Sequence, residues 1–93
     1  MFSVEMTDEY LIWQSRLSDK QRLLVDARLE RLKSFGHLGI YKHIEGPLIE
    51  LKWKQGLRVY LARTEEKKFV LLWGGNKNGQ DRDIKKAKNL LSP

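Results

Sequence analysis

The chain has 93 residues, which predicts a single domain, residues 1–93, with a small core. It contains no cysteine, which excludes disulfides and thiolate metal sites. The formal net charge of +6 favours a polyanionic partner. The first residues lack the pattern of a secretory signal, and the longest apolar run, residues 69–73, is too short to cross a bilayer. We therefore expect a cytoplasmic protein without a membrane partner.

The first part of the chain predicts a strand and two helices. Apolar and polar residues alternate from residue 2 to residue 6, as in a short strand. Thr7 has the character of a helix N-cap, and residues 18–21 have the form of a capping box that begins a second helix. Gly36 is expected to end this helix. Residues 37–47 contain glycines, a proline and no clear period, and we predict a loop there.

Three alternating segments follow, residues 48–54, 57–64 and 69–75, and predict an antiparallel meander. A connection made of residues 54–56 keeps the apolar side chains of the first two strands on one face. A shift of one residue would move all of them to the opposite face, so this register is favoured. It gives the pairs Trp53 with Leu57, Leu51 with Val59, and Ile49 with Leu61.

The same reasoning places the third strand and the last helix. With a loop at residues 65–67, Leu61 faces Leu71 and Val59 faces Trp73, and Arg58 lies opposite Gly74. We expect the two first helices on one face of the sheet and open space on the other. A last helix runs from about residue 81 to residue 91 and completes an α+β domain. Its packing stripe is Ile84, Ala87 and Leu91.

The open face of the predicted sheet carries the candidate chemistry. Lys52 and Arg58 should be cross-strand neighbours, and like charges in that position destabilise a sheet. Either a ligand anion or a bridging Glu50 would relieve this repulsion, and the sequence leaves both readings open. Tyr60 is a candidate to donate to a phosphate or to stack on a base, and it is equally typical of an ordinary strand.

A glycine-containing loop, residues 74–79, follows the third strand of the meander. It has the glycine spacing of a P-loop but lacks the Lys-Ser/Thr that should follow, which argues against a nucleotide-hydrolysing P-loop. Lys77 and backbone N–H groups could still bind an anion there, or the segment could be a flexible connection. Neither histidine has a partner at ligand spacing, so no metal site is expected.

Three motifs in this half of the chain resemble the RelE/ParE toxin superfamily. They are Glu50-Leu51-Lys52, GLRVY at residues 56–60, and GGNKNGQDRDIKKAK at residues 74–88. The resemblance covers nearly the whole chain and is greatest for the small "addiction module killer protein" (HigB-like) branch, which typically has E-L-R, G-Y-R-V-Y and G-G-D-K-S-x-Q-x-x-D-I-x-x-A. The chain departs from this pattern at Leu57, at Asn76 and at residues 78–79. It also lacks the C-terminal Tyr or His that some RelE-like nucleases use as acid or base.

The resemblance implies a small RelE-like domain and the toxin of a type II toxin–antitoxin system. Such a toxin is neutralised by a protein antitoxin, usually of the helix-turn-helix type in this branch, through which the complex binds operator DNA. RelE-like members cut mRNA on the ribosome without a metal, through attack of a ribose 2′-OH on its own phosphate. The resemblance therefore implies a metal-independent mRNA endonuclease that inhibits translation and needs no cofactor.

The resemblance also implies roles for individual residues. Arg58 corresponds to the strand arginine of the family and is expected to stabilise charge that develops on the phosphate oxygens. Lys52 and Lys77 complete the expected catalytic group by holding flanking phosphates, and crowding by Lys54 and Arg58 favours Lys52 as the base. Residues expected to contact RNA are Lys54, Tyr60, Gln80, Lys85 and Lys86.

Two other functions fit the same sequence. A ParE-like poison of DNA gyrase would act by binding and leave transcripts intact. A non-catalytic RNA-binding module would bind RNA in a salt-sensitive manner and would neither cleave it nor be toxic. One scaffold hosts several activities, so the fold does not decide among them.

Overall fold

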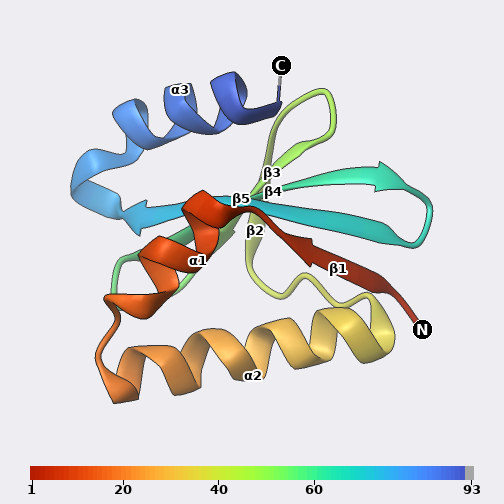
Figure 1. The fold of residues 1–93 in the computed structure, drawn as a ribbon, viewed down its shortest axis with the longest axis horizontal. Coiled ribbons are helices and arrows are strands. Elements are labelled where there is room, and N and C mark those ends of the chain that lie inside the picture. Colours follow the sequence, from red (N-terminus) through yellow and green to blue (C-terminus); the bar gives the residue numbers. More distant parts are fainter. Residues whose placement is uncertain (92–93) are drawn as a thin grey trace.

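The structure is a computed structural model that describes residues 1–91. A strand and two helices come first, and a four-stranded segment, a 3-10 turn and a last helix follow (Figure 1). No helix in this part of the chain is long and apolar enough to cross a membrane. The elements are β1 (Ser3–Met6), α1 (Asp8–Ser15), α2 (Asp19–Phe35), β2 (Tyr41–Glu45), β3 (Leu48–Lys52), β4 (Leu57–Glu65), β5 (Lys68–Asn76), η1 (Lys77–Gly79) and α3 (Gln80–Leu91).

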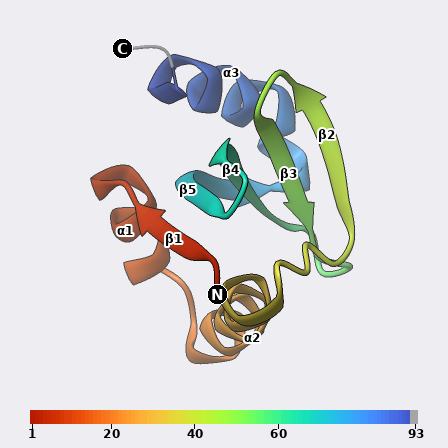
Figure 2. The same cartoon turned by 90° about the vertical axis from the view of Figure 1, so that its right-hand side faces the viewer.

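The strands form one sheet in the order β1-β5-β4-β3-β2. β1 runs parallel to β5, and the other neighbouring pairs are antiparallel. α1 and α2 lie on one side of the sheet and α3 on the other (Figure 1 and Figure 2). The predicted α+β class and the packing of the first two helices on one face are confirmed. The core on that face includes Tyr10, Val25, Leu29, Leu32, Leu51, Val59, Leu61, Phe69 and Leu71.

The helix ends form where the local sequence predicts them. The Thr7 hydroxyl accepts a hydrogen bond from the backbone N–H of Tyr10 at 3.0 Å. Ser18 and Gln21 form the reciprocal capping box, with distances of 3.2 and 3.0 Å. Gly36 ends α2 with φ of 71°, a conformation that glycine adopts without steric cost. These contacts satisfy backbone groups that the helices leave unpaired at their ends.

The loop predicted for residues 37–47 is wrong in its second half. Residues Tyr41–Glu45 form β2, which pairs with β3 at the edge of the sheet. Only Ile44 among these five side chains is part-buried, so the strand shows little of the alternation that sequence reading depends on. The meander therefore has four strands instead of three.

The register of the meander is confirmed for its first pair and wrong for part of its second. Leu51 pairs with Val59, and Ile49 pairs with Leu61, as predicted. Leu61 also faces Leu71, but a bulge between Tyr60 and Leu61 shifts the rest of the β4–β5 pair by one residue. The resulting pairs are Val59 with Gly74 and Arg58 with Gly75, instead of Val59 with Trp73 and Arg58 with Gly74.

The second face of the sheet is not the open surface that the sequence predicted. α3 packs on it and closes a second core, in which Tyr60 and Ala87 are both fully buried. The physical reason is that this face carries apolar side chains between its polar ones, and burying them against the apolar stripe of α3 is favourable. The buried members of this core are Leu48, Tyr60, Ala62, Leu72 and Ala87.

Candidate functional site

Arg58 lies where β3 and β4 meet, across from Lys52 as predicted. Its Nη1 donates to the backbone carbonyls of Trp53 at 3.1 Å and Leu57 at 2.9 Å. The side chain is only 13% exposed, and its Nε has no hydrogen-bond partner. The guanidinium is therefore fixed by backbone groups at one end of the sheet, where only part of it reaches solvent.

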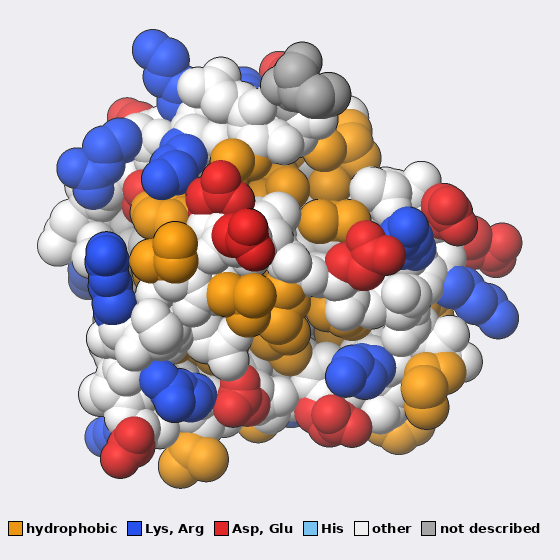
Figure 3. Space-filling model, in the orientation of Figure 1, with side chains coloured by type: hydrophobic (Ala, Val, Ile, Leu, Met, Phe, Trp, Pro, Cys, Tyr) orange, Lys and Arg blue, Asp and Glu red, His pale blue; other side chains and the backbone are white. Residues whose placement is uncertain are grey.

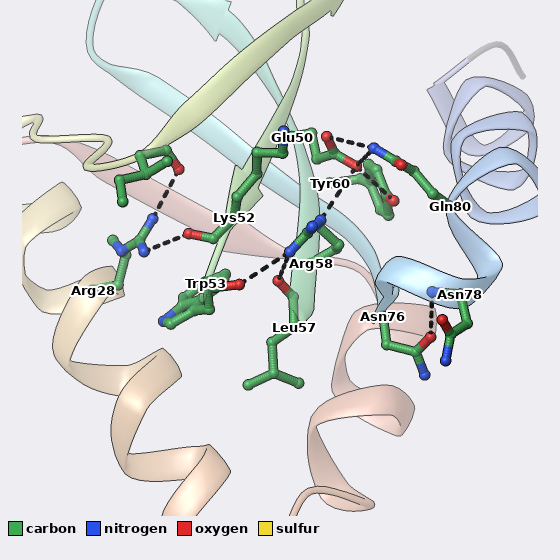
Figure 4. A network of polar contacts seen from close by, with 11 residues as sticks. Arg28, Glu50, Lys52, Trp53, Leu57, Arg58, Tyr60, Asn76, Asn78 and Gln80 are labelled. Carbon is green, nitrogen blue, oxygen red and sulfur yellow. Dashed lines mark hydrogen bonds and ion pairs between the residues drawn. The ribbon is translucent and has the colours of Figure 1, made fainter. Parts of the chain in front are cut away.

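Glu50 is a fully buried carboxylate beside this arginine. It accepts a hydrogen bond from the Tyr60 hydroxyl at 2.9 Å and two from the Gln80 amide nitrogen at 2.8 and 3.0 Å (Figure 4). Its closest approach to Arg58 is 4.0 Å, between Oε2 and Nε. Glu50 is thus the carboxylate that the sequence offered as a bridge, but it is a buried hub and not part of a surface salt-bridge cluster.

Tyr60 cannot contact RNA in this arrangement. Its ring is fully buried in the core under α3, and its hydroxyl donates to Glu50. Burial, followed by the hydrogen bond to Glu50, raises the pKa of Tyr60 above its ordinary range. Stacking of Tyr60 on a base, expected from the sequence, therefore does not fit the structure, in which Tyr60 holds Glu50 in position.

Gln80, like Tyr60, helps to hold the Glu50 carboxylate in position. It is the first residue of α3, and its amide nitrogen is engaged with both carboxylate oxygens of Glu50. This link ties α3 to β3 beside Arg58. For Gln80 to contact RNA through that nitrogen, the link to Glu50 would have to open.

The lysines of the expected site are more accessible. Lys52 is half-buried, and Lys54 and Lys77 are exposed near the same end of the sheet. The Lys77 side chain runs along Gly56, and its backbone N–H donates to the Gly56 carbonyl at 2.8 Å. Lys77 lines a cavity of about 360 Å³ between α1 and the end of β5, and a second one of about 350 Å³ at the start of α3.

Lys85 and Lys86 are both exposed on α3. The Lys86 ammonium lies 3.6 Å above the ring of Trp73, which is a cation–π contact. Lys and Arg side chains are spread along the left edge of the face in Figure 3, near the end of β5 and the start of α3. In the described part of the chain, no group of three or more His, Cys, Asp or Glu residues is arranged to hold a metal ion.

Comparisons with known proteins identify one relative by sequence and a fold by structure. No family model matches the chain. An uncharacterized protein of Haemophilus influenzae is 40% identical over 81 residues, which cover 84% of this chain and 81% of that protein. The chain belongs to the family of this protein.

Two crystal structures share the fold. They are the intact E. coli RelBE toxin–antitoxin complex and the isolated E. coli RelE toxin, each with a TM-score of 0.70 and 14% sequence identity. The match covers 82% of this chain in both cases, and 96% and 84% of the respective matched chains. The chain therefore has the RelE fold, as the sequence motifs predicted.

Sequence reasoning missed how the site of this RelE-fold chain is held together. Nothing in the sequence indicates that Gln80 reaches back to Glu50, because the contact spans 30 residues. Arg28 was also overlooked: it stacks on Trp53 at 4.2 Å and donates to the Lys52 carbonyl at 2.7 Å. The available signal was the short helical step from Arg28 to Arg31, which predicts two guanidinium groups near each other on one side of α2.

Proposed function

We propose that the protein is the toxin of a type II toxin–antitoxin pair, of the HigB-like branch, and that it cleaves mRNA at the ribosome without a metal ion. The observation that carries this proposal is the Arg58 guanidinium, fixed by two backbone carbonyls and free of a bidentate carboxylate. A cation that is already positioned stabilises charge on a phosphate without reorganisation during the reaction.

The environment of Arg58 supports an anionic substrate. Lys52 is its cross-strand neighbour, so two like charges lie together on β3 and β4. Glu50, the nearest acid, makes its shorter contacts with Tyr60 and Gln80 and leaves Arg58 at 4.0 Å. A phosphate near Arg58 and Lys52 would therefore reduce the repulsion between them.

The proposed reaction is an internal transesterification of RNA. The ribose 2′-oxygen attacks the neighbouring phosphorus and loses its proton, the bond from phosphorus to the 5′-oxygen breaks, and that oxygen takes up a proton. Arg58 stabilises the extra charge on the non-bridging oxygens, with Lys77 on a flanking phosphate. Lys52, the cross-strand neighbour of Arg58, is the residue that we assign to accept the 2′-OH proton.

The proposed partners follow from the same assignment. The E. coli RelE chain with this fold occurs in a complex of toxin and antitoxin. We propose that a helix-turn-helix antitoxin, encoded by a neighbouring gene, binds and neutralises this chain in the cytoplasm. That complex would bind operator DNA through the antitoxin.

Sequencing of RNA ends after induced expression tests this function. The proposal predicts growth arrest together with new mRNA ends that the Arg58→Ala variant does not produce. Intact transcripts with inhibited DNA supercoiling would instead identify a gyrase poison. RNA binding without cleavage or toxicity would identify a non-catalytic module.

A further inference from the structure

A second group of basic side chains lies beside the Arg58 site. Arg28, Arg31 and His37 line an open cavity of about 350 Å³ between α2 and the segment that leads into β2. Gly39 and Ile40 complete its wall. A cavity of this size accommodates a phosphate group and part of a nucleotide.

The guanidinium of Arg28 is held rigidly in this wall. It donates to the carbonyls of Leu38 and Ile40, both at 3.2 Å, and of Lys52 at 2.7 Å. One face of it stacks on the Trp53 ring at 4.2 Å. Because Arg28 is already fixed, little side-chain entropy is lost when an anion binds beside it.

The positive charge of the cavity is not neutralised by the protein. Within residues 1–91, neither Arg28 nor Arg31 forms a salt bridge with a carboxylate. Burial, followed by the positive charge of Arg31, lowers the pKa of Arg28. An anion placed between these two groups would relieve their repulsion.

His37 adds an exposed aromatic ring to the same cavity. Its ring lies 5.7 Å from that of Phe35, whose side chain is 66% exposed. Basic groups beside exposed aromatic rings are the combination that single-stranded nucleic acid binds, through its phosphates and its bases. This favours a strand of nucleic acid over a small inorganic anion.

The cavity and the Arg58 site lie on either side of the same strand end. Arg28 binds the carbonyl of Lys52, and Lys52 is the cross-strand neighbour of Arg58. The next carbonyl, that of Trp53, accepts from Arg58 (Figure 4). The two guanidinium groups therefore bind consecutive carbonyls, at residues 52 and 53, where β3 ends.

We propose that the Arg28–Arg31–His37 cavity binds a backbone phosphate of the RNA strand whose scissile phosphate lies at Arg58. This inference rests on the proposed function, because it extends the path of the same substrate. It assigns the cavity as a subsite that holds the strand and takes no part in bond cleavage.

Binding of a 2′-O-methyl single-stranded RNA oligonucleotide, which the protein cannot cleave, tests the subsite by fluorescence anisotropy. The variants are Arg31→Gln and Arg31→Glu, which change an exposed residue and leave the fixed Arg28 in place. Matched controls are Lys33→Gln and Lys33→Glu, on the same helix but outside this cavity. Arg31→Gln should weaken binding about three- to fivefold. The slope of log K against log salt concentration should become shallower by about 0.7, as expected when one phosphate contact to a single strand is lost. Both effects should be larger for Arg31→Glu.

Arg58→Gln, with its fold checked by circular dichroism, separates the two proposals. Weaker binding by both the Arg58 and the Arg31 variants, with the Lys33 variants unchanged, supports the subsite. Weaker binding by Arg58→Gln alone overturns the subsite and leaves the proposed function standing. An equal loss of RNA affinity in the Arg31 and Lys33 variants has the same meaning. A wild-type chain that does not bind the oligonucleotide overturns the subsite, whereas the proposed function, which places cleavage at the ribosome, is decided by the sequencing of RNA ends.

Discussion

Arg58 and Glu50 lie on adjacent strands with Nε and Oε2 4.0 Å apart, yet the carboxylate makes its shorter contacts with Tyr60 and Gln80. The arginine instead donates to two backbone carbonyls. The pair therefore combines a fixed cation with an acid that is already satisfied by neutral donors. Arg58 is therefore not held by a bidentate carboxylate, and Glu50 is a residue of structural importance.

Replacing Glu50 should destabilise the fold. Glu50→Ala leaves the buried Tyr60 hydroxyl without its acceptor and removes the link from β3 to Gln80. An unsatisfied buried polar group costs about 1–3 kcal/mol, so we expect a loss of this size in urea unfolding. The control is Glu45→Ala, since Glu45 is an exposed acid paired with Lys88 at 3.6 Å and should contribute about 1 kcal/mol or less. Equal losses for the two variants would contradict the buried hub.

Stability should fall at high pH, and Tyr60 should contribute to the decline. Burial and the hydrogen bond to Glu50 raise the pKa of Tyr60 from its ordinary value of 10.0. The folded state keeps this proton where the unfolded chain releases it, so the stabilisation is complete below pH 10.0 and decreases as the pH rises further. Tyr60→Phe should flatten the decline by at most about 1.4 kcal/mol per pH unit.

The control for this pH effect is Tyr41→Phe, because Tyr41 is 50% exposed on β2. It removes a phenol from the surface and so measures how much of any change in the pH curve comes from the loss of an exposed tyrosine. Parallel curves for wild type and Tyr60→Phe above pH 10.0 would show that Tyr60 is not held in its neutral form by the fold.

The bulge in β5 makes Gly74 a packing position against α1. A methyl group at Gly74 would lie far inside contact distance of the Trp13 ring. Gly74→Ala should therefore cost about 1–3 kcal/mol through overpacking. The cost should shrink by more than about 0.5 kcal/mol in a Trp13→Leu background, as a double-mutant cycle measures. Additive costs would place Gly74 away from Trp13, as in the register predicted without the bulge.

The reach of sequence reasoning depends on how local each signal is. The caps at Thr7 and Ser18 are formed by residues within three positions, and both were predicted correctly. The pairing of Leu51 with Val59 followed from the alternation of apolar residues on either side of a short turn. The bulge between Tyr60 and Leu61 has no such signal, so the predicted register failed there.

The candidate site shows the same limit. The neighbouring positions of Lys52 and Arg58 could be predicted because they depend on one turn. The burial of Glu50 and Tyr60 depends on where α3 packs, and the apolar stripe of α3 did not say which face of the sheet it covers. Contacts that span long stretches of sequence, such as Gln80 with Glu50, require the three-dimensional structure.

The cleavage rate of ribosome-bound mRNA by Arg58→Ala, compared with the wild type and with Arg63→Ala, tests the central claim most directly. Arg63 lies on the same strand, is exposed and donates to the Glu66 carbonyl, so its removal controls for the loss of one charge. We predict that Arg58→Ala stays folded and cleaves about 10²- to 10³-fold more slowly, while Arg63→Ala cleaves at nearly the wild-type rate. A folded Arg58→Ala variant that cleaves as fast as the wild type would contradict the account.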